Sequence, residues 1–139
     1  MRRVHTIFLA LALLAGAALT PARASGAEPL FIHLSTDDAH RTAAGLTFGQ
    51  HQQQDGHPLT IFLSDRGALL AARAHAERYA APQRLLAELM QQGATVLVVP
   101  LSLKHYGVRE DELLPGLQLS YRKLSGAALF RPETRVLGW

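Results

Sequence analysis

The chain from residue 28 onward predicts a three-layer α/β fold, in which a mostly parallel, five-stranded sheet has helices on both faces. Its apolar runs, of which Leu30–Leu34 and Ala94–Val99 are examples, are short and continuous, as is typical of strands buried on both faces. Segments with a helical pattern lie between these runs. Because alternating strands and helices favour parallel strands joined by right-handed crossovers, we expect one α/β domain over residues 28–139.

Two strands and a long helix are predicted in the first part of this domain. The first strand is Leu30–Leu34, and the three polar residues after it are all N-cap types. A helix should therefore begin near Asp38, and Gly56 is a suitable residue to end it. The second strand is Pro58–Leu63.

The middle of the domain predicts further helix and the third strand. The alanine-rich residues Ala68–Tyr79 are expected to be helical in part. Pro82 suits a first helical turn, and apolar residues at helical spacing continue from it to Gly93, which should end the helix. Ala94–Val99 is apolar and rich in β-branched residues, so it is the clearest strand of the sequence.

Shorter elements are predicted in the last part of the chain. We expect a loop at Pro100–His105, a short acidic helix at Arg109–Leu114, a strand at Leu117–Ser120, a helix at Leu124–Leu129 and a final strand at Thr134–Leu137. Phe130, Leu137 and Trp139 are large and apolar, and we expect them to be buried against the sheet or a neighbouring subunit. Deletion of residues 136–139 should then reduce solubility or assembly.

Residues 1–27 have the features of a secretory signal peptide. A basic start, Met1–Arg3, precedes an apolar run over residues 7–19, and Ala22-Arg23-Ala24 supplies the small-x-small pattern of a cleavage site. Cleavage after Ala24 or Ala27 would leave a secreted or periplasmic domain with no stable membrane anchor. An uncleaved anchor is the less favoured alternative, since the apolar run is shorter than the roughly 20 residues of a membrane span.

The composition argues against several classes of function. The chain has 14 Lys and Arg against 11 Asp and Glu, but three of the basic residues lie in the leader, so the domain has no net charge. Nucleic acid and anionic membranes are therefore not expected partners. The chain contains no cysteine, which excludes disulfides and the usual structural zinc site. The GxGxxG and Walker motifs are absent, and we predict no cofactor.

Polar residues follow three of the predicted strands. Ligands bind beyond the carboxyl ends of the strands in open α/β sheets, so we expect these segments to line a common cleft. The candidate cleft residues are Ser35, Thr36, Asp37, Asp38, His40, Arg41, Ser64, Asp65, Ser102, Lys104 and His105.

Simpler roles compete with each of these candidates. Asp37 and Asp38 are more often helix caps than acid/base groups. Ser102 with His105 as its base and one of these aspartates is the candidate catalytic set, yet Ser102 lies in no GxSxG motif. A metal site that combines His33 and His40 with Asp37 or Asp38 is a weaker option, and we predict no metal.

Six segments of the domain follow one another in the order of a known family. They are the strand Leu30–Ser35, the stretch Gly56–Leu63, the helix and strand of Leu86–Val99, the pair Gly107-Val108, the acidic stretch Glu110–Leu117 and the ending Val136–Trp139. In this order they resemble the DsrE/DsrF-like family of sulfur-relay proteins. The resemblance covers residues 28–139 and implies a DsrEFH-like domain, flavodoxin-like in style, that forms homo-trimers or hexamers.

The same resemblance raises the question of activity. Active members of the family bear a persulfide on a cysteine after the third strand, and the two matching positions in this chain are Val99 and Ser102. A serine hydroxyl cannot replace the thiolate that carries the sulfur. We therefore predict an exported DsrE-like protein without sulfurtransferase chemistry, which binds a small ligand or a protein partner or serves in an assembly. The alternative is a hydrolase or transferase that uses Ser102 or His105, with Asp37 or Asp38, on a small anionic or sulfur-containing substrate.

Overall fold

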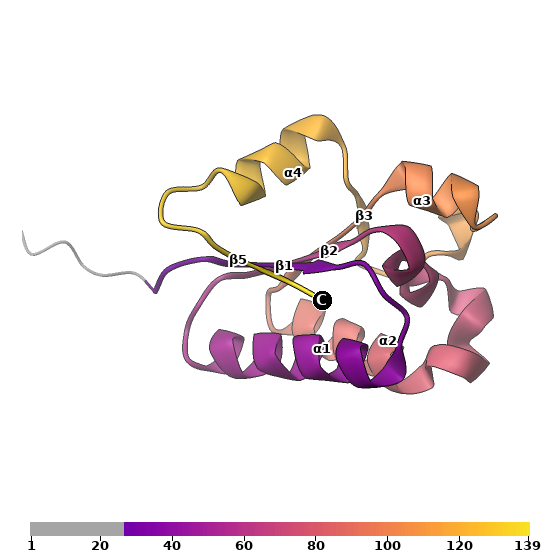
Figure 1. Ribbon diagram of the computed structural model, residues 1–139, viewed down its shortest axis with the longest axis horizontal. Coiled ribbons are helices and arrows are strands. Elements are labelled where there is room, and N and C mark those ends of the chain that lie inside the picture. Colours follow the sequence, from indigo (N-terminus) through magenta and orange to yellow (C-terminus); the bar gives the residue numbers. More distant parts are fainter. Residues whose placement is uncertain (1–26) are drawn as a thin grey trace, which may run out of the picture.

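The computed structural model describes residues 27–139 (Figure 1). The predicted signal peptide falls on residues 1–27, and all but the last of these lie outside the described residues. Within residues 27–139, no helix is long and apolar enough to cross a membrane.

Five parallel strands form one sheet in the order β4-β3-β2-β1-β5. The strands are β1 (Leu30–Leu34), β2 (Leu59–Leu63), β3 (Thr95–Val98), β4 (Gln118–Leu119) and β5 (Arg135–Gly138). Ile32 of β1 lies opposite Ile61 of β2 on one side and Leu137 of β5 on the other. The predicted three-layer α/β fold is confirmed, and all the strands of this sheet are parallel.

Helices cover both faces of the sheet. They are α1 (Ala39–Gln54), α2 (Ala76–Gln91), α3 (Pro100–His105) and α4 (Arg122–Leu129), with 3₁₀ turns η1 (Asp65–Ala71), η2 (Arg73–His75) and η3 (Glu110–Glu112). Figure 1 shows α1 and α2 side by side under one face and α4 over the other, with α3 beyond the end of β3.

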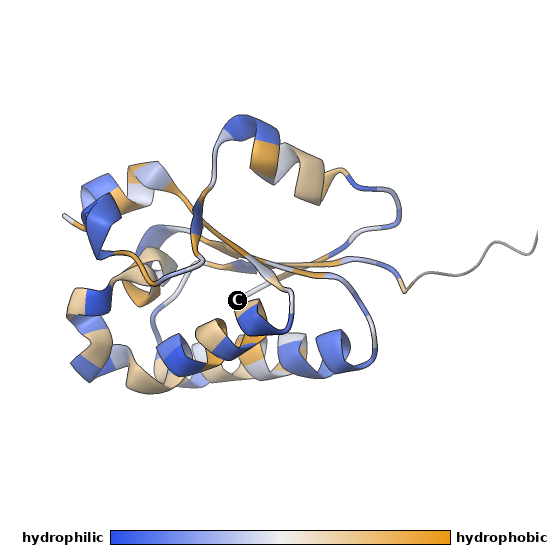
Figure 2. Cartoon of the chain, turned by 180° about the vertical axis from the view of Figure 1, so that it is seen from behind, coloured by the Kyte–Doolittle hydropathy of each residue, from blue (hydrophilic) through white to orange (hydrophobic). Residues whose placement is uncertain are grey.

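The main core lies between the sheet and the α1–α2 layer. Leu30, Ile32 and Leu34 alternate along β1 and belong to this core, together with residues of β2, β3, α1 and α2. Phe31 points to the opposite face, where its ring packs on that of Phe62 with 5.6 Å between the centroids. Figure 2 shows that the strands at the centre are mainly apolar, whereas polar and apolar stretches alternate along the helices.

The α1 helix begins and ends where the residue types predict. The Asp38 side chain accepts a hydrogen bond from the Arg41 backbone N–H at 2.9 Å, as an N-cap does. Gly56 follows the helix with φ of +93°, a conformation that glycine adopts without strain. Gly93 ends α2 in the same way, with φ of +98°.

The structure corrects three of the predicted elements. Pro100–His105 is the short helix α3 rather than a loop, because Pro100 occupies its first turn, where a missing N–H costs nothing. α2 begins at Ala76, six residues before Pro82, but its backbone is non-helical at Tyr79, so Pro82 does lie in the first turn after a kink. The acidic helix is reduced to the single turn η3.

The three large apolar residues near the carboxyl end differ in their surroundings. Trp139 packs on α1, where its ring lies against Gly45 and its centroid is 6.0 Å from that of Phe48. Phe130 is 83% exposed and Leu137 is 38% exposed. The prediction that these two are buried against the sheet is therefore wrong, and burial against a neighbouring subunit stays a prediction.

Candidate functional site

The carboxyl edge of the sheet brings together the three segments that were predicted to meet there. Asp37 follows β1, Asp65 follows β2, and Ser102 lies in α3, which follows β3. Parallel strands end at the same edge, so residues far apart in the sequence become neighbours. The backbone N–H of Asp65 donates to the Ser102 Oγ at 2.9 Å, across 37 residues of sequence.

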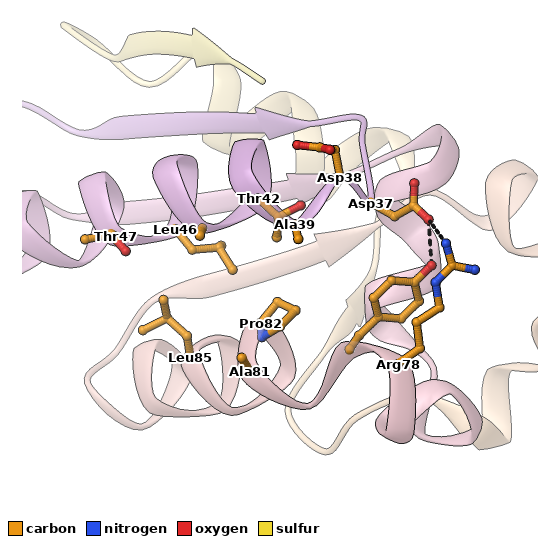
Figure 3. A pocket seen from close by; sticks show the side chains of 12 residues that line it. Asp37, Asp38, Ala39, Thr42, Leu46, Thr47, Arg78, Ala81, Pro82 and Leu85 are labelled. Carbon is orange, nitrogen blue, oxygen red and sulfur yellow. Dashed lines mark hydrogen bonds and ion pairs between the residues drawn. The ribbon is translucent and has the colours of Figure 1, made fainter.

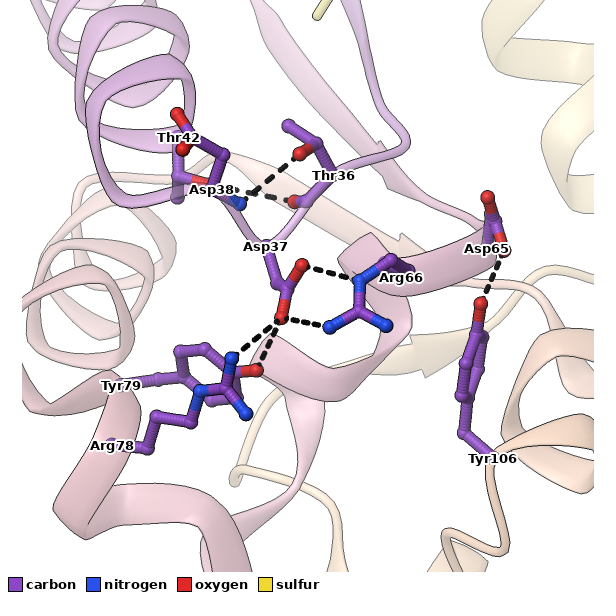
Figure 4. A network of polar contacts seen from close by, with 9 residues as sticks. All are labelled: Thr36, Asp37, Asp38, Thr42, Asp65, Arg66, Arg78, Tyr79 and Tyr106. Carbon is purple, nitrogen blue, oxygen red and sulfur yellow. Dashed lines mark hydrogen bonds and ion pairs between the residues drawn. The ribbon is translucent and has the colours of Figure 1, made fainter.

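Asp37 is the centre of a polar network that ties β1 to η1 and α2 (Figure 4). Its Oδ1 accepts a hydrogen bond from Arg66 Nε at 2.6 Å, and its Oδ2 accepts one from Arg66 Nη2 at 2.8 Å. The Tyr79 hydroxyl donates to Oδ2 at 2.6 Å, and Arg78 Nη2 lies 3.5 Å from the same oxygen. The two-pronged contact with Arg66 is the strongest geometry that a guanidinium and a carboxylate can form.

The turn after β2 explains how Arg66 reaches Asp37. Gly67 lies directly against β1, so close that a Cβ at this position would be 2.1 Å from the Leu34 carbonyl oxygen. Only glycine permits this approach. Asp65 enters the turn with φ of +44°, which aspartate tolerates better than most residues. The turn therefore positions Arg66 beside Asp37, which lies three residues after the end of β1.

The network holds Asp37 in its ionised form. Hydrogen bonding from Arg66, with that from Tyr79, lowers the pKa of Asp37 from its ordinary value of 3.8 to about 2. Burial and the bond to Asp37 raise the pKa of Tyr79. A general acid or base works best with a pKa near the working pH. Asp37 is therefore a structural anion at neutral pH and is not suited to proton transfer.

A cavity of about 550 Å³ opens between α1 and α2 beside this network (Figure 3). Its walls are mainly apolar, and its charged side chains gather at the end where α1 begins. The residues that line it are Asp37, Asp38, Ala39, Thr42, Ala43, Leu46, Thr47, Arg78, Tyr79, Ala81, Pro82 and Leu85. The kink at Tyr79 and the ring of Pro82 shape the α2 wall.

A second, more open hollow lies over α3 and the end of β2. It is lined by Ser64, Asp65, Leu101, Ser102, His105 and Tyr106 and has a volume of about 560 Å³. The Tyr106 hydroxyl donates to the Asp65 carboxylate, and this bond raises the pKa of the tyrosine.

The predicted cleft is thus two separate hollows rather than one. Asp37 and Asp38 line the α1–α2 cavity, whereas Ser64, Asp65, Ser102 and His105 line the hollow over α3. The Ser35 hydroxyl donates to the Trp139 carbonyl oxygen, and the Thr36 hydroxyl accepts from the Asp38 N–H, so both have local structural partners. His40, Arg41 and Lys104 are exposed and line neither hollow.

The candidate catalytic set does not assemble in residues 27–139. No hydrogen bond in this part of the chain joins Ser102 to His105, and the Ser102 hydroxyl accepts from the Asp65 backbone instead. Asp37 is engaged by Arg66, and Asp38 caps α1. An active serine needs a base within hydrogen-bond reach, which this arrangement does not provide.

The histidines do not form the weaker, metal-binding alternative either. The Nε2 atom of His33 is 2.6 Å from the Ser64 Oγ, so this ring is engaged between β1 and β2. Among the described residues, no group of three or more His, Asp or Glu side chains is placed to hold a metal ion.

Four residues that contribute side chains to the Asp37 network or to the walls of the two hollows were not among the predicted site residues. They are Arg66, Arg78, Tyr79 and Tyr106. Arg66 directly follows the candidate Asp65 in the segment after β2, and this position could have indicated that it belongs to the site. The other three lie in helical segments or at their ends, where the sequence shows no pattern that sets them apart from solvent-facing residues.

Comparison with solved structures identifies the architecture. The chain has a DsrE-like fold. It is similar to the ychN protein from E. coli, with a TM-score of 0.66 and 16% identity over 81% of this chain and 100% of that chain. It is also similar to MTH1491 from Methanobacterium thermoautotrophicum, described as a protein of unknown function, with a TM-score of 0.65 and 15% identity over the same shares. No family model and no curated protein matches the sequence.

Proposed function

We propose that this protein is an exported binding protein that holds a small, largely apolar molecule in the α1–α2 cavity and has no sulfur-transfer activity. The observation that supports the proposal most directly is the cavity itself. Its volume of about 550 Å³ lies within the roughly 300–1,000 Å³ range of small-molecule sites, and its walls combine apolar side chains with a few charged groups at one end.

The polar end of the cavity is organised before any ligand arrives. Arg66 and Tyr79 hold Asp37 in one position, and the Arg78 guanidinium stacks over the Tyr79 ring at 5.1 Å. Such preorganisation reduces the entropy that a ligand must lose on binding. Arg78 remains 69% exposed in its side chain, so it is free to contact the polar end of a bound molecule.

The body of the ligand is expected to be apolar. Leu46 on α1 and Leu85 on α2 lie across the cavity from one another, and the Pro82 ring forms part of the α2 wall (Figure 3). Burial of an apolar surface gives about 25 cal/mol per Å², so a molecule of modest size gains several kcal/mol from these walls.

Substitution of Ala81 tests the cavity. This residue lines the cavity and is exposed, so Ala81→Phe should fill the space without disturbing the core. Its neighbour Ala80 is also exposed on α2 but does not line the cavity, which makes Ala80→Phe the matched control. Titration with the apolar dye anilinonaphthalene sulfonate should show binding to the wild type and to A80F, and at least about tenfold weaker binding to A81F. Equal affinity of the two variants would contradict the proposal.

Native mass spectrometry of protein purified from the periplasm adds an independent readout. We expect a chain cleaved near Ala24 or Ala27 and a retained small molecule in the A80F variant that A81F lacks. Recovery of the protein only in the cytoplasm, with residues 1–27 intact, would contradict export.

The lack of sulfur transfer is tested by restoring a thiol. Ser102 occupies one of the two positions that match the cysteine of active DsrE-like proteins, and its Oγ accepts a hydrogen bond from the Asp65 N–H. A thiolate at this site would receive the same bond, which favours the charged form. Incubation with a persulfide donor should add sulfur to Ser102→Cys and not to the wild type, as measured by intact mass. Sulfane-sulfur transfer by the wild-type protein, which has no cysteine, would disprove this part of the proposal.

A further inference from the structure

Four of the seven large apolar side chains that are exposed in the described residues lie in or near β5. Val136 is 53% exposed, Leu137 38%, Phe130 83% and Phe48 39%. Val136 and Phe130 line the same hollow under α4, so they lie on the α4 face of the sheet. Leu137 pairs with the core residue Ile32 and therefore lies on the α1 face, as Phe48 does. Both faces of the sheet therefore carry solvent-exposed apolar side chains at this edge.

The backbone of β5 is also open along one side. In the part of the chain that the structure describes, β5 pairs with β1 alone and forms an edge of the sheet. Arg135 donates to the Pro29 carbonyl and Trp139 donates to the His33 carbonyl, so the odd-numbered residues face β1. Because a strand alternates its hydrogen-bonding direction, Val136 and Gly138 direct their N–H and C=O groups away from the sheet.

The edge lacks the devices that usually protect a strand from pairing. Natural edge strands carry charges, prolines or bulges at exposed positions. Here the only charge on β5 is that of Arg135, and Glu28 neutralises it through two hydrogen bonds of 2.6 and 3.0 Å. The following Val-Leu-Gly segment is uncharged.

We propose that this edge is an assembly surface whose partner is the β5 edge of a second copy, in antiparallel pairing around a two-fold axis. Val136 of each copy would exchange two main-chain hydrogen bonds with Gly138 of the other, which gives four bonds in all. Leu137 then meets its own counterpart at the axis as a non-hydrogen-bonded pair, with about 4.5 Å between Cα atoms.

The second copy fits this edge better than an unrelated strand for two reasons. The donors and acceptors of Val136 and Gly138 are complementary to themselves under a two-fold rotation, so that the contact closes. An axis perpendicular to the sheet also places like faces together. Val136 and Phe130 are then joined by the same residues of the other copy on one face, and Leu137 and Phe48 on the other. No part of the α1–α2 cavity enters this contact, so the inference is independent of ligand binding.

A single introduced cysteine tests the geometry, because the chain has no other. In Leu137→Cys the two Cβ atoms at the axis lie close to the roughly 3.5–4.5 Å that a disulfide requires. Leu101→Cys is the matched control, since Leu101 is 76% exposed and lies on α3, away from β5. Mild oxidation of each purified full chain should give disulfide-linked dimers of L137C at least about ten times faster than of L101C. Equal rates would overturn the proposal.

Sedimentation velocity provides the second measurement. The wild type should have an even number of subunits, either a dimer or a hexamer in which this contact joins three-fold rings. Val136→Lys places a charge on each side of the axis and should halve the mass or leave trimers, with an unchanged far-UV circular dichroism spectrum because Val136 is half-exposed. A wild type that is monomeric, as expected if the edge binds another protein, would overturn the proposal. An isolated trimer, or V136K with the wild-type mass, would also overturn it.

Discussion

At the scale of single residues, Asp37 and Asp38 show how two adjacent carboxylates acquire different roles. Asp38 is exposed and caps α1 through the Arg41 N–H. Asp37 has a side chain only 8% exposed and contacts groups from η1 and α2. The residue type is the same, so the difference comes from the direction of the chain as it leaves β1. A capping role was predicted for both, and it is confirmed for Asp38 only.

Replacement of Asp37 by Asn should show how much the network contributes to the free energy of unfolding. The Arg66 guanidinium would lose its charged partner, and the free energy of unfolding should fall by about 2 kcal/mol. Asp38→Asn is the matched control, because Asn caps helices as well as Asp does, and we expect it to be nearly neutral. Urea unfolding at neutral pH measures both. Equal losses in the two variants would show that the network contributes nothing beyond capping.

The same pair of variants predicts a pH dependence. The folded state lowers the pKa of Asp37 from 3.8 to about 2, so the stabilisation is present above about pH 4 and is lost as the pH falls toward 2. In Asp37→Asn this part of the acid destabilisation should be missing, whereas Asp38→Asn should keep it. If the free energies of unfolding of D37N and wild type change with pH in the same way across this range, the assignment of the acid destabilisation to Asp37 would be contradicted.

At the scale of elements, α1 owes its position on the sheet to two glycines. A Cβ on Gly49 would lie 2.9 Å from the Ile32 Cδ1, and one on Gly45 would lie 3.0 Å from the Trp139 ring. The helix therefore approaches β1 and the chain after β5 more closely than alanine would permit. These close contacts place the amino end of α1, and with it the polar end of the cavity, against the carboxyl edge of the sheet.

Glycine-to-alanine substitutions separate packing from helix propensity. Gly49→Ala should lower the free energy of unfolding by about 1–3 kcal/mol, because the added methyl group overpacks the contact with β1. Gly126→Ala in α4 is the control, since a Cβ there meets nothing within 4 Å. It should stabilise the protein by about 0.5–1 kcal/mol through the backbone entropy of the unfolded state. Thermal and urea unfolding test both, and a stabilising Gly49→Ala would show that α1 can move away from the sheet.

Element predictions succeeded where a local signal is strong and failed where it is short. Both ends of α1 and the carboxyl end of α2 were predictable because Asp38, Gly56 and Gly93 act through local preferences for capping or for positive φ. α3 was predicted as a loop because its six residues give no periodic pattern. Its helical form is stabilised by contacts with the rest of the fold, where Leu103 is buried in the main core.

At the scale of the whole molecule, the segment after α4 completes the sheet. β5 adds a fifth strand beside β1, and Trp139 then covers Gly45 of α1. Ser35 donates both its N–H and its hydroxyl to the Trp139 carbonyl oxygen, each at 2.9 Å. The carboxyl end of the sheet is thus connected to the polar segment that leads to Asp37.

Deletion of residues 136–139 should therefore destabilise the whole domain. It would leave the β1 edge without a partner and expose the apolar surface beneath Trp139. We expect a melting temperature lower by several degrees, reduced solubility and loss of self-association, measured by calorimetry and sedimentation. Val136→Lys is the control that keeps β5 and should lose only the association. An unchanged melting curve and mass after the deletion would contradict this role of the segment.

The sequence by itself determined the α/β class, the parallel sheet and most element boundaries, because apolar periodicity, N-cap types and glycine preferences act over a few neighbouring residues. The lack of a thiol was also evident from the composition. Only the tertiary structure decided that the candidate residues divide between two hollows and that Asp37 is bound by Arg66 and Tyr79. These partners follow Asp37 by 29 and 42 positions. Contacts of this kind depend on how closely the turn after β2 and the kinked α2 approach the end of β1, and no local pattern in the chain specifies those distances.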